Sequence, residues 1–201
     1  MTQPLAHVRA HLSSHFDAQP DSASVTFLGA EPIEVLRFRC GQDGLVHYVS
    51  AGCSRHPMID PTQMLVDRLR GPRAEVVLRL RDPGPVTGLA RSLAIVAATP
   101  AVDGVVLAAD ALIDLGSPLW GDSPARPSGR APFTAVLLGR SDIPDLPLEP
   151  PCDPVGFLAA TPITATEAAW VRLKGAEAMR QAWQNDGVDV LDPNRPAAQP
   201  R

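Results

Sequence analysis

Three histidines near the start of the chain, His7, His11 and His15, are spaced four residues apart. On a helix this spacing places them on one face, and two histidines four residues apart can bind zinc. His7 and His15 would lie about 12 Å apart along the helix axis, so the three side chains cannot bind one ion. The spacing therefore predicts surface histidines and no metal site.

A second group of residues with chemical potential lies between Cys40 and His56. Cys53 and His56 form a C-x-x-H step, but zinc needs four ligands, or three and a water, and only His47 lies nearby in sequence. A nucleophile needs a base that faces it, and the chain contains no G-x-S-x-G turn. Because free cysteines are commonly buried, we expect Cys53 to be a packing residue. A metal-dependent hydrolase, or a cysteine or serine hydrolase that uses the His47–His56 region, stays open as an alternative.

Residues 116–132 contain three glycines and four prolines, which predicts a long irregular loop. Aromatic side chains on ordered loops are favoured anchors of protein interfaces. Trp120 and its neighbour Asp122 are therefore candidate partner-binding residues. The alternative is that Trp120 packs back over the core.

Alternating or β-branched segments predict strands, and apolar residues three or four apart predict helices. The expected strands are 24–28, 33–40, 45–51, 74–81, 133–139 and 155–160, with one or two short strands more in 103–115. The segments 33–40 and 45–51 form a hairpin around a Gly-rich turn at 41–44, and 74–81 reads as a half-buried antiparallel strand. Helices are expected at 5–16, from Leu89 to a stop at Pro100, and from a capping box at Thr164 and Glu167 onward, ending near Gly187.

This order of elements predicts one α+β domain, with a mostly antiparallel or mixed sheet and helices packed on it. A chain of 201 residues with 45% hydrophobic residues fits one such core. We assign residues 1–20 to an N-terminal helix that is part of the domain and 22–193 to its main body. Residues 194–201 carry two prolines and little to bury, so we expect a disordered tail.

Charge and composition narrow the function. A net charge of −4 argues against a nucleic-acid binder. The three cysteines fit no disulfide framework, and neither a signal region nor a membrane-spanning stretch is evident, which predicts a cytoplasmic protein. The residues GQDG at 41–44 lack the lysine of a phosphate-binding loop, and no cofactor is expected. One lysine against seventeen arginines is typical of a GC-rich, bacterial genome.

Four segments together resemble the suppressor-of-fused family. They are HYVSAGCSRHPM at 47–58, AEVVLRLR at 74–81, FTAVLLG at 133–139 and PITATEAAWVRLKGAEAM at 162–179. Their order and spacing carry the resemblance, which covers Ser22 to Arg195. Two departures stand out: the chain is too short for the second domain of the animal members, and Cys53 stands where such sequences often carry Met.

The resemblance implies an α+β fold and a non-enzymatic, protein-binding role. Animal members of the family sequester a transcription factor and hold its peptide partly by strand addition. Bacterial single-domain members are similar to proposed immunity proteins, which neutralise polymorphic toxins. We therefore expect a cytoplasmic binding protein whose partner is a toxin domain, or alternatively a regulatory module that holds an endogenous peptide by strand addition. The sequence leaves the oligomeric state open.

Overall fold

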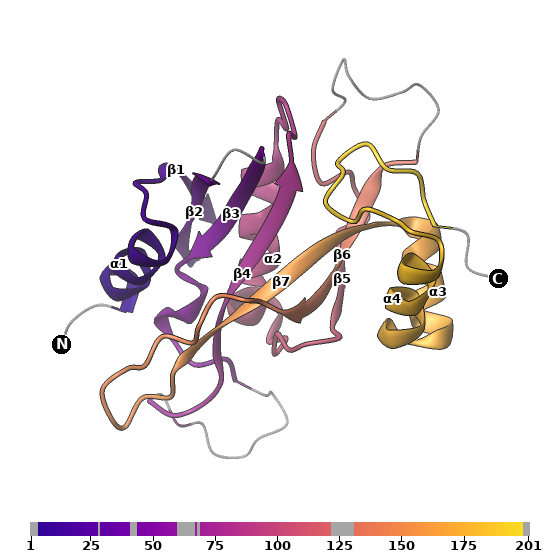
Figure 1. Cartoon of the computed structure of the whole chain (residues 1–201). Helices are drawn as coiled ribbons and strands as arrows, with labels where there is room; N and C mark the ends of the chain where they lie inside the picture. Colours follow the sequence, from indigo (N-terminus) through magenta and orange to yellow (C-terminus); the bar gives the residue numbers. More distant parts are fainter. Residues whose placement is uncertain are drawn as a thin grey trace.

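The computed structural model describes residues 4–27, 29–40, 44–59, 67, 69–121 and 131–198. Within these ranges the chain forms one seven-stranded sheet and four α-helices (Figure 1). In chain order the elements are α1 (Pro4–Phe16), β1 (Asp21–Phe27), β2 (Ala30–Cys40), β3 (Leu45–Ala51), the 3-10 turn η1 (Cys53–Arg55), β4 (Arg73–Arg81), α2 (Leu89–Asp103), β5 (Leu112–Asp114), β6 (Phe133–Arg140), β7 (Val155–Thr164), α3 (Ala165–Lys174) and α4 (Ala176–Asn185).

The strands lie in the order β1-β2-β3-β4-β7-β6-β5. All neighbours pair antiparallel except β4 and β7, which run parallel from Arg73 beside Val155 to Leu78 beside Ala160. The predicted mixed sheet in an α+β fold is confirmed. The hairpin of β2 and β3 is also confirmed, with Phe38 opposite His47; residues 41–43 of its predicted turn lie outside the described residues.

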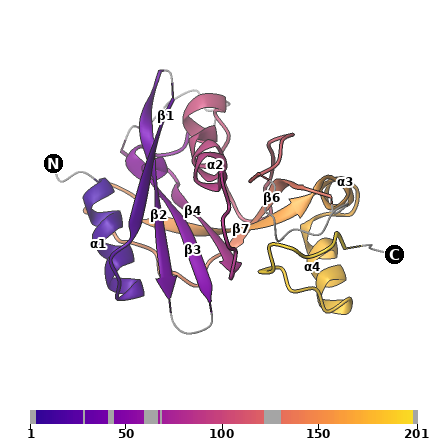
Figure 2. The same cartoon turned by 90° about the horizontal axis from the view of Figure 1, so that it is seen from above.

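Helices cover both faces of the sheet (Figure 2). Helix α2 packs on one face over a large apolar cluster that includes Val76 and Leu93. On the other face, α1 covers the β2–β4 end through Val8 and Leu12, and α3 with α4 covers the β6 end through Met179. Alternate residues of a strand point to opposite faces, so each central strand contributes to more than one cluster.

The expectation that 74–81 is a half-buried antiparallel strand is wrong in two respects. Strand β4 is central: β3 pairs with it antiparallel, as predicted, but β7 on its other side runs parallel to it. Its second face is also covered over much of its length, because Val77 packs in the α1 cluster and Glu75 is fully buried. The alternation of Glu75, Val77 and Arg79 indicated a solvent face, but a charged residue can be buried where partners satisfy it.

Helix α2 does not stop at Pro100 as predicted; it continues to Asp103. Proline removes one backbone donor, which leaves the carbonyl of residue 96 without its usual partner. The Thr99 hydroxyl donates to the Val96 carbonyl at 2.8 Å and supplies that bond. Gly104, with φ +67°, then ends the helix in a left-handed conformation. In the following segment, 103–115, the structure contains the single short strand β5.

The predicted capping box at the start of α3 is confirmed. The Thr164 hydroxyl accepts a bond from the Glu167 N–H at 3.3 Å, and the Glu167 carboxylate accepts one from the Thr164 N–H at 2.9 Å. This Glu167 is fully buried and has further partners in the C-terminal segment. The box therefore connects α3 to the end of the chain.

The prediction of a disordered tail from residue 194 is wrong for residues 194–198. Arg195 is only 4% exposed, and its guanidinium forms an ion pair with Glu167 at 2.7 Å and lies over the rings of Phe133 and Trp183. The Ala198 N–H also donates to Glu167, at 3.1 Å. Composition suggested nothing to bury here, because the reason for burial is a carboxylate 28 residues earlier. Residues 199–201 lie outside the described part of the chain.

Candidate functional site

The His47–His56 region is organised around the buried carboxylate of Glu75. It accepts bonds from the Gly52 N–H at 2.8 Å, the Ser54 N–H at 3.0 Å and the Ser54 hydroxyl at 2.6 Å. The Ser50 hydroxyl also donates to it, while accepting from the Val76 N–H. These bonds fix η1 against β4, and both serines are buried, so the hydroxyls serve the fold and do not face a substrate.

Cys53 lies at the start of η1 and packs against the α2 cluster. Burial, assisted by the negative charge of Glu75, raises the pKa of the Cys53 thiol well above its usual value. A nucleophilic cysteine needs a lowered pKa and a nearby base. The environment of Cys53 is thus that of a packing residue, as its sequence context predicts.

The histidines of this region lie in different environments. His56 is 77% exposed, with Glu31 at 3.8 Å as its ion-pair partner. His47 is buried under α1 against Phe16, and burial, together with the charge of Arg79, lowers its pKa. The hydrolase alternative would require one of them to face a nucleophile, and no described contact joins either to Cys53 or to the buried serines.

The stripe of His7, His11 and His15 lies on α1, and its members have different neighbours. His11 hydrogen-bonds to the Pro144 carbonyl at 2.8 Å and stacks on Phe157. His15 contacts Phe16 edge to face. Among the described residues, no group of three His, Cys, Asp or Glu side chains is arranged to hold a metal ion.

Trp120 packs into the core. It is only 5% exposed and its ring centroid lies 5.4 Å from that of Phe133. Of the two interpretations of this loop, packing over the core therefore describes Trp120, whose side chain offers little surface to a partner. Asp122 lies outside the described residues.

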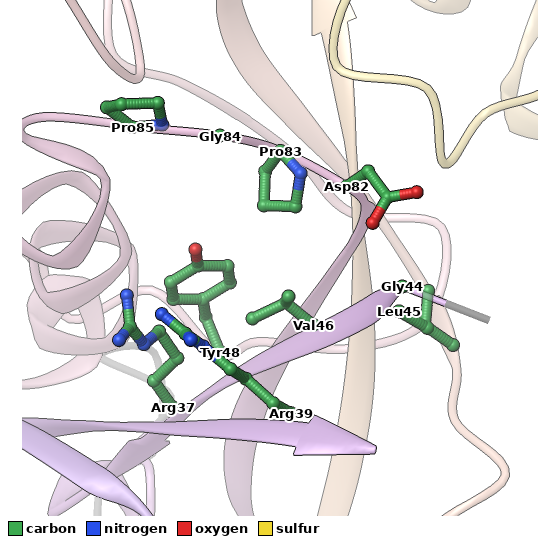
Figure 3. Close-up of a pocket in the computed structure, with 10 residues that line it drawn as sticks. All are labelled: Arg37, Arg39, Gly44, Leu45, Val46, Tyr48, Asp82, Pro83, Gly84 and Pro85. Carbon is green, nitrogen blue, oxygen red and sulfur yellow. The ribbon is translucent and has the colours of Figure 1, made fainter. Parts of the chain in front are cut away.

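Three cavities lie side by side on the α2 face of the sheet, near strand β1. The first, of about 730 Å³, is the arginine cavity (Figure 3), lined by Arg37, Arg39, Gly44, Leu45, Val46, Tyr48, Asp82, Pro83, Gly84 and Pro85. A second, of about 350 Å³, shares Arg37 and Tyr48 with it and continues to Asp21 and the start of α2. A third, of about 560 Å³, lies between residues 24–27 of β1 and the exposed side of α2. Together they form what we call the β1–α2 trough.

Strand β1 borders this trough and is a free edge of the sheet. It pairs with β2, and no other described strand pairs with its opposite side. Most of its residues are exposed, while Val25 and Phe27 turn partly toward the α2 cluster. Asp21, at its start, is bonded by Arg37 at 2.7 Å, which lowers the pKa of the Asp21 carboxyl. An edge strand beside a groove can pair its backbone with a peptide and receive alternate side chains.

Sequence reasoning missed the residues that line this trough. The sequence contained a signal for them: Arg37 and Arg39 occupy the same face of β2 as Ile33 and Val35, which pack in the α2 cluster. Two arginines at core-facing positions indicate that the core ends there and that a polar cavity begins. Tyr48 lies opposite Arg37 on β3.

The comparisons with known proteins agree with the fold. Residues 29–196 match the suppressor of fused protein (SUFU) family. The chain therefore belongs to the suppressor of fused family, a family of protein-interaction domains. No curated protein matches its sequence significantly.

Three solved structures share the fold at low sequence identity. A suppressor of fused homologue from Neisseria gonorrhoeae matches with a TM-score of 0.64 and 18% identity, over 96% of each chain. A chain of a Sufu–Fu complex matches at 0.62 and 15%, over 98% of this chain and 90% of the other. Drosophila Suppressor of Fused matches at 0.66 and 16%, over 98% of this chain but 51% of its own length, so this chain spans about half of the Drosophila protein. No helix among the described residues is long and apolar enough to span a bilayer.

Proposed function

We propose that this chain is a non-enzymatic binding protein that holds a partner protein at the edge of β1 and in the β1–α2 trough. The observation that carries the proposal is the exposed β1 edge beside a cavity of about 560 Å³. Natural edge strands are commonly protected by Lys or Pro, by bulges or by a covering element. The sequence of β1, DSASVTF, contains neither Lys nor Pro, and its bulge lies near its end, between Val25 and Phe27.

The groove beside β1 offers apolar contact as well as backbone pairing. Ile95 and Val102 of α2 line it, and Val102 is 60% exposed. Exposed apolar side chains beside an unpaired edge favour a peptide or a loop of another protein as the occupant. A small substrate would require polar groups that converge on a reacting atom, and the buried Ser–Glu75 network lines none of the main cavities among the described residues.

We further propose that the partner is a toxin domain and that the protein acts in the cytoplasm as an immunity protein. This part rests on the resemblance to bacterial single-domain family members. The fold match over 96% of both chains with the Neisseria homologue supports the comparison with such members. The same edge would suit an endogenous peptide, so the identity of the partner decides between immunity and regulation.

The proposal predicts a toxin gene beside the gene of this protein, and the test is protection of cells that express that toxin, together with the affinity of the purified pair. Val102→Glu places a charge in the groove at a position where an exposed side chain leaves the core intact. The matched control is Leu173→Glu, an apolar residue of α3 that is 73% exposed on another part of the molecule. We expect Val102→Glu to weaken binding about tenfold or more and Leu173→Glu to have no effect. If L173E lost protection while V102E kept it, the proposed surface would be contradicted. If the protein formed a complex only with a protein unrelated to toxins, the regulatory role would be favoured.

A further inference from the structure

The arginine cavity brings two cationic side chains and a phenol together. Arg37 and Arg39 alternate along β2 and so share a face, opposite Tyr48 and Val46 of β3. Figure 3 shows the side chains of Arg37, Arg39 and Tyr48 gathered on one side of the cavity, across from Pro83–Pro85. Helix α2 begins beyond this point, at Leu89, and leaves the cavity uncovered.

One of the two cationic side chains of this cavity has no ion-pair partner within the described part of the chain. Arg37 donates to Asp21 at 2.7 and 3.2 Å, whereas Arg39 is exposed and forms no ion pair with a described residue. Asp21 lines the adjoining cavity, and the acid in the lining of the arginine cavity itself, Asp82, lies against Gly44, where a Cβ would overlap its carboxylate. Like charges on one strand face repel each other, and a bound anion would relieve this repulsion.

Other features of the cavity add to its preference for a negative charge. Burial raises the pKa of the Tyr48 hydroxyl, although Arg37 acts in the opposite direction. A protonated phenol can donate a hydrogen bond to a carboxylate. The adjoining cavity contains the start of α2, where Gly88 offers no side-chain cap, and the positive end of the helix dipole favours an anion there.

The shape and the apolar lining distinguish a peptide from a small anion. Leu45, Val46, Pro83 and Pro85 supply apolar surface to a volume of about 730 Å³. The cavity also adjoins the rest of the β1–α2 trough, because the second cavity shares Arg37 and Tyr48 with it. Arginine pairs with carboxylates in a planar, two-bond geometry. We propose that the arginine cavity receives an Asp or Glu side chain, or a C-terminal carboxylate, from an acidic and partly apolar segment of the partner protein.

This inference rests on the proposed function, since it names the chemistry of the segment that the trough would hold. Selection of a phage-displayed library of random linear peptides on the immobilised protein tests it without a known partner. The selected peptides are then synthesised and their affinities measured by fluorescence polarisation. Arg39→Glu is the informative variant, because Arg39 has no ion pair in the described structure. Arg140→Glu is the matched control: Arg140 is also exposed, and it lines a separate cavity with Arg79 and Arg180.

We expect the wild-type protein and R140E to select peptides rich in Asp and Glu, and R39E to bind them about tenfold more weakly or worse. Raised salt should weaken the wild-type affinity, because the interaction is between charges near the surface. Peptides without carboxylates that bind R39E as tightly as wild type would overturn the inference while leaving the protein-binding proposal in place. If inorganic phosphate displaced the peptides at a concentration equal to theirs, the inference would be overturned in favour of a simple anion site. A library without binders would also overturn it, and the separate comparison of V102E with L173E would show whether the proposed function fails with it.

Discussion

Replacing Arg195 by methionine should remove a large part of the stability of this domain. Methionine keeps an unbranched apolar chain against Phe133 and Trp183 but removes the charge that Glu167 faces. The two side chains are 3% and 0% exposed, so the carboxylate would stay buried without its counter-ion. Breaking a buried pair by removing one partner costs about 3–5 kcal/mol.

The structure places the expected loss near the lower end of that range. After the change, Glu167 would still accept bonds from the Thr164 N–H and hydroxyl, the Trp183 indole N–H and the Ala198 N–H. We therefore expect a loss of about 3 kcal/mol. For a domain of this size this corresponds to a fall in melting temperature of roughly 6–12 °C. The double variant Thr164→Ser/Arg195→Met should be about as stable as Arg195→Met alone, because serine supplies the same hydroxyl to Glu167.

The pH dependence gives a second, independent signature. Burial on its own would raise the pKa of Glu167, but Arg195, Thr164 and Trp183 together lower it below its usual value. The stability from a lowered carboxyl pKa is present above the unfolded value of about 4.3 and is lost as pH falls through the folded value. In Arg195→Met the pKa of Glu167 should rise instead, because burial then outweighs the remaining donors. The difference in stability between wild type and variant should therefore shrink as the pH is lowered.

Urea denaturation followed by circular dichroism, at neutral and at acidic pH, measures both effects. The matched control is Arg172→Met, which removes a surface ion pair with Asp114 at 2.6 Å between partly exposed side chains. Such a pair contributes about 0–1 kcal/mol. If Arg195→Met destabilised the protein no more than Arg172→Met, or if its deficit stayed constant with pH, the role assigned to the Glu167–Arg195 pair would be refuted.

Three further predictions concern residues described above. Burial and the nearby charge of Arg79 lower the pKa of His47. The contribution of His47 to stability is therefore present above pH about 6.5 and is lost as the pH falls through its folded pKa. His47→Phe should flatten the pH dependence of stability in that window, and thermal melts that show an unchanged dependence would contradict this. Cys53 and Cys152 are both partly buried, but Cys53, with its raised pKa, should react with iodoacetamide more slowly than Cys152 in the native protein. Equal rates by mass spectrometry would argue against a raised pKa at Cys53. Thr164→Ala should cost about 1 kcal/mol of unfolding free energy in urea and Thr164→Ser much less; equal losses would mean that the hydroxyl does not cap α3.

Elements defined by neighbouring residues could be predicted from the sequence. The capping box at Thr164 and Glu167 depends on a spacing of three residues, and the β2–β3 hairpin depends on two adjacent strand patterns. The helix from Leu89 was also predicted, but its end was not, because the Thr99 hydroxyl replaces the donor that Pro100 lacks. Local sequence patterns therefore predicted these elements, with errors of a few residues at their ends.

Features that depend on distant residues could not be predicted in the same way. Nothing near Ala74 shows that β4 pairs with β7, and nothing near Arg195 shows that Glu167 is buried. The candidate site was the hardest feature to predict from the sequence. Trp120 was chosen from the composition of its loop alone, whereas the trough forms where β1, β3 and the start of α2 meet. The alternation that places Arg37 and Arg39 on one face can be read from the sequence, but its meaning depends on where α2 begins.

The parallel pairing of β4 with β7 has a consequence for how the protein is made. Everything from Asp82 to Pro154 lies between these two central strands in the chain. During synthesis the strands from β1 to β4 emerge first, so the inner edge of β4 has no partner until β7 leaves the ribosome. Contacts between such distant segments also slow folding, since a long loop must close before they form. For many seconds the half-made protein thus exposes an unpaired strand edge in the middle of its sheet, whereas in the finished protein the described sheet has free edges only at its two outer strands, β1 and β5.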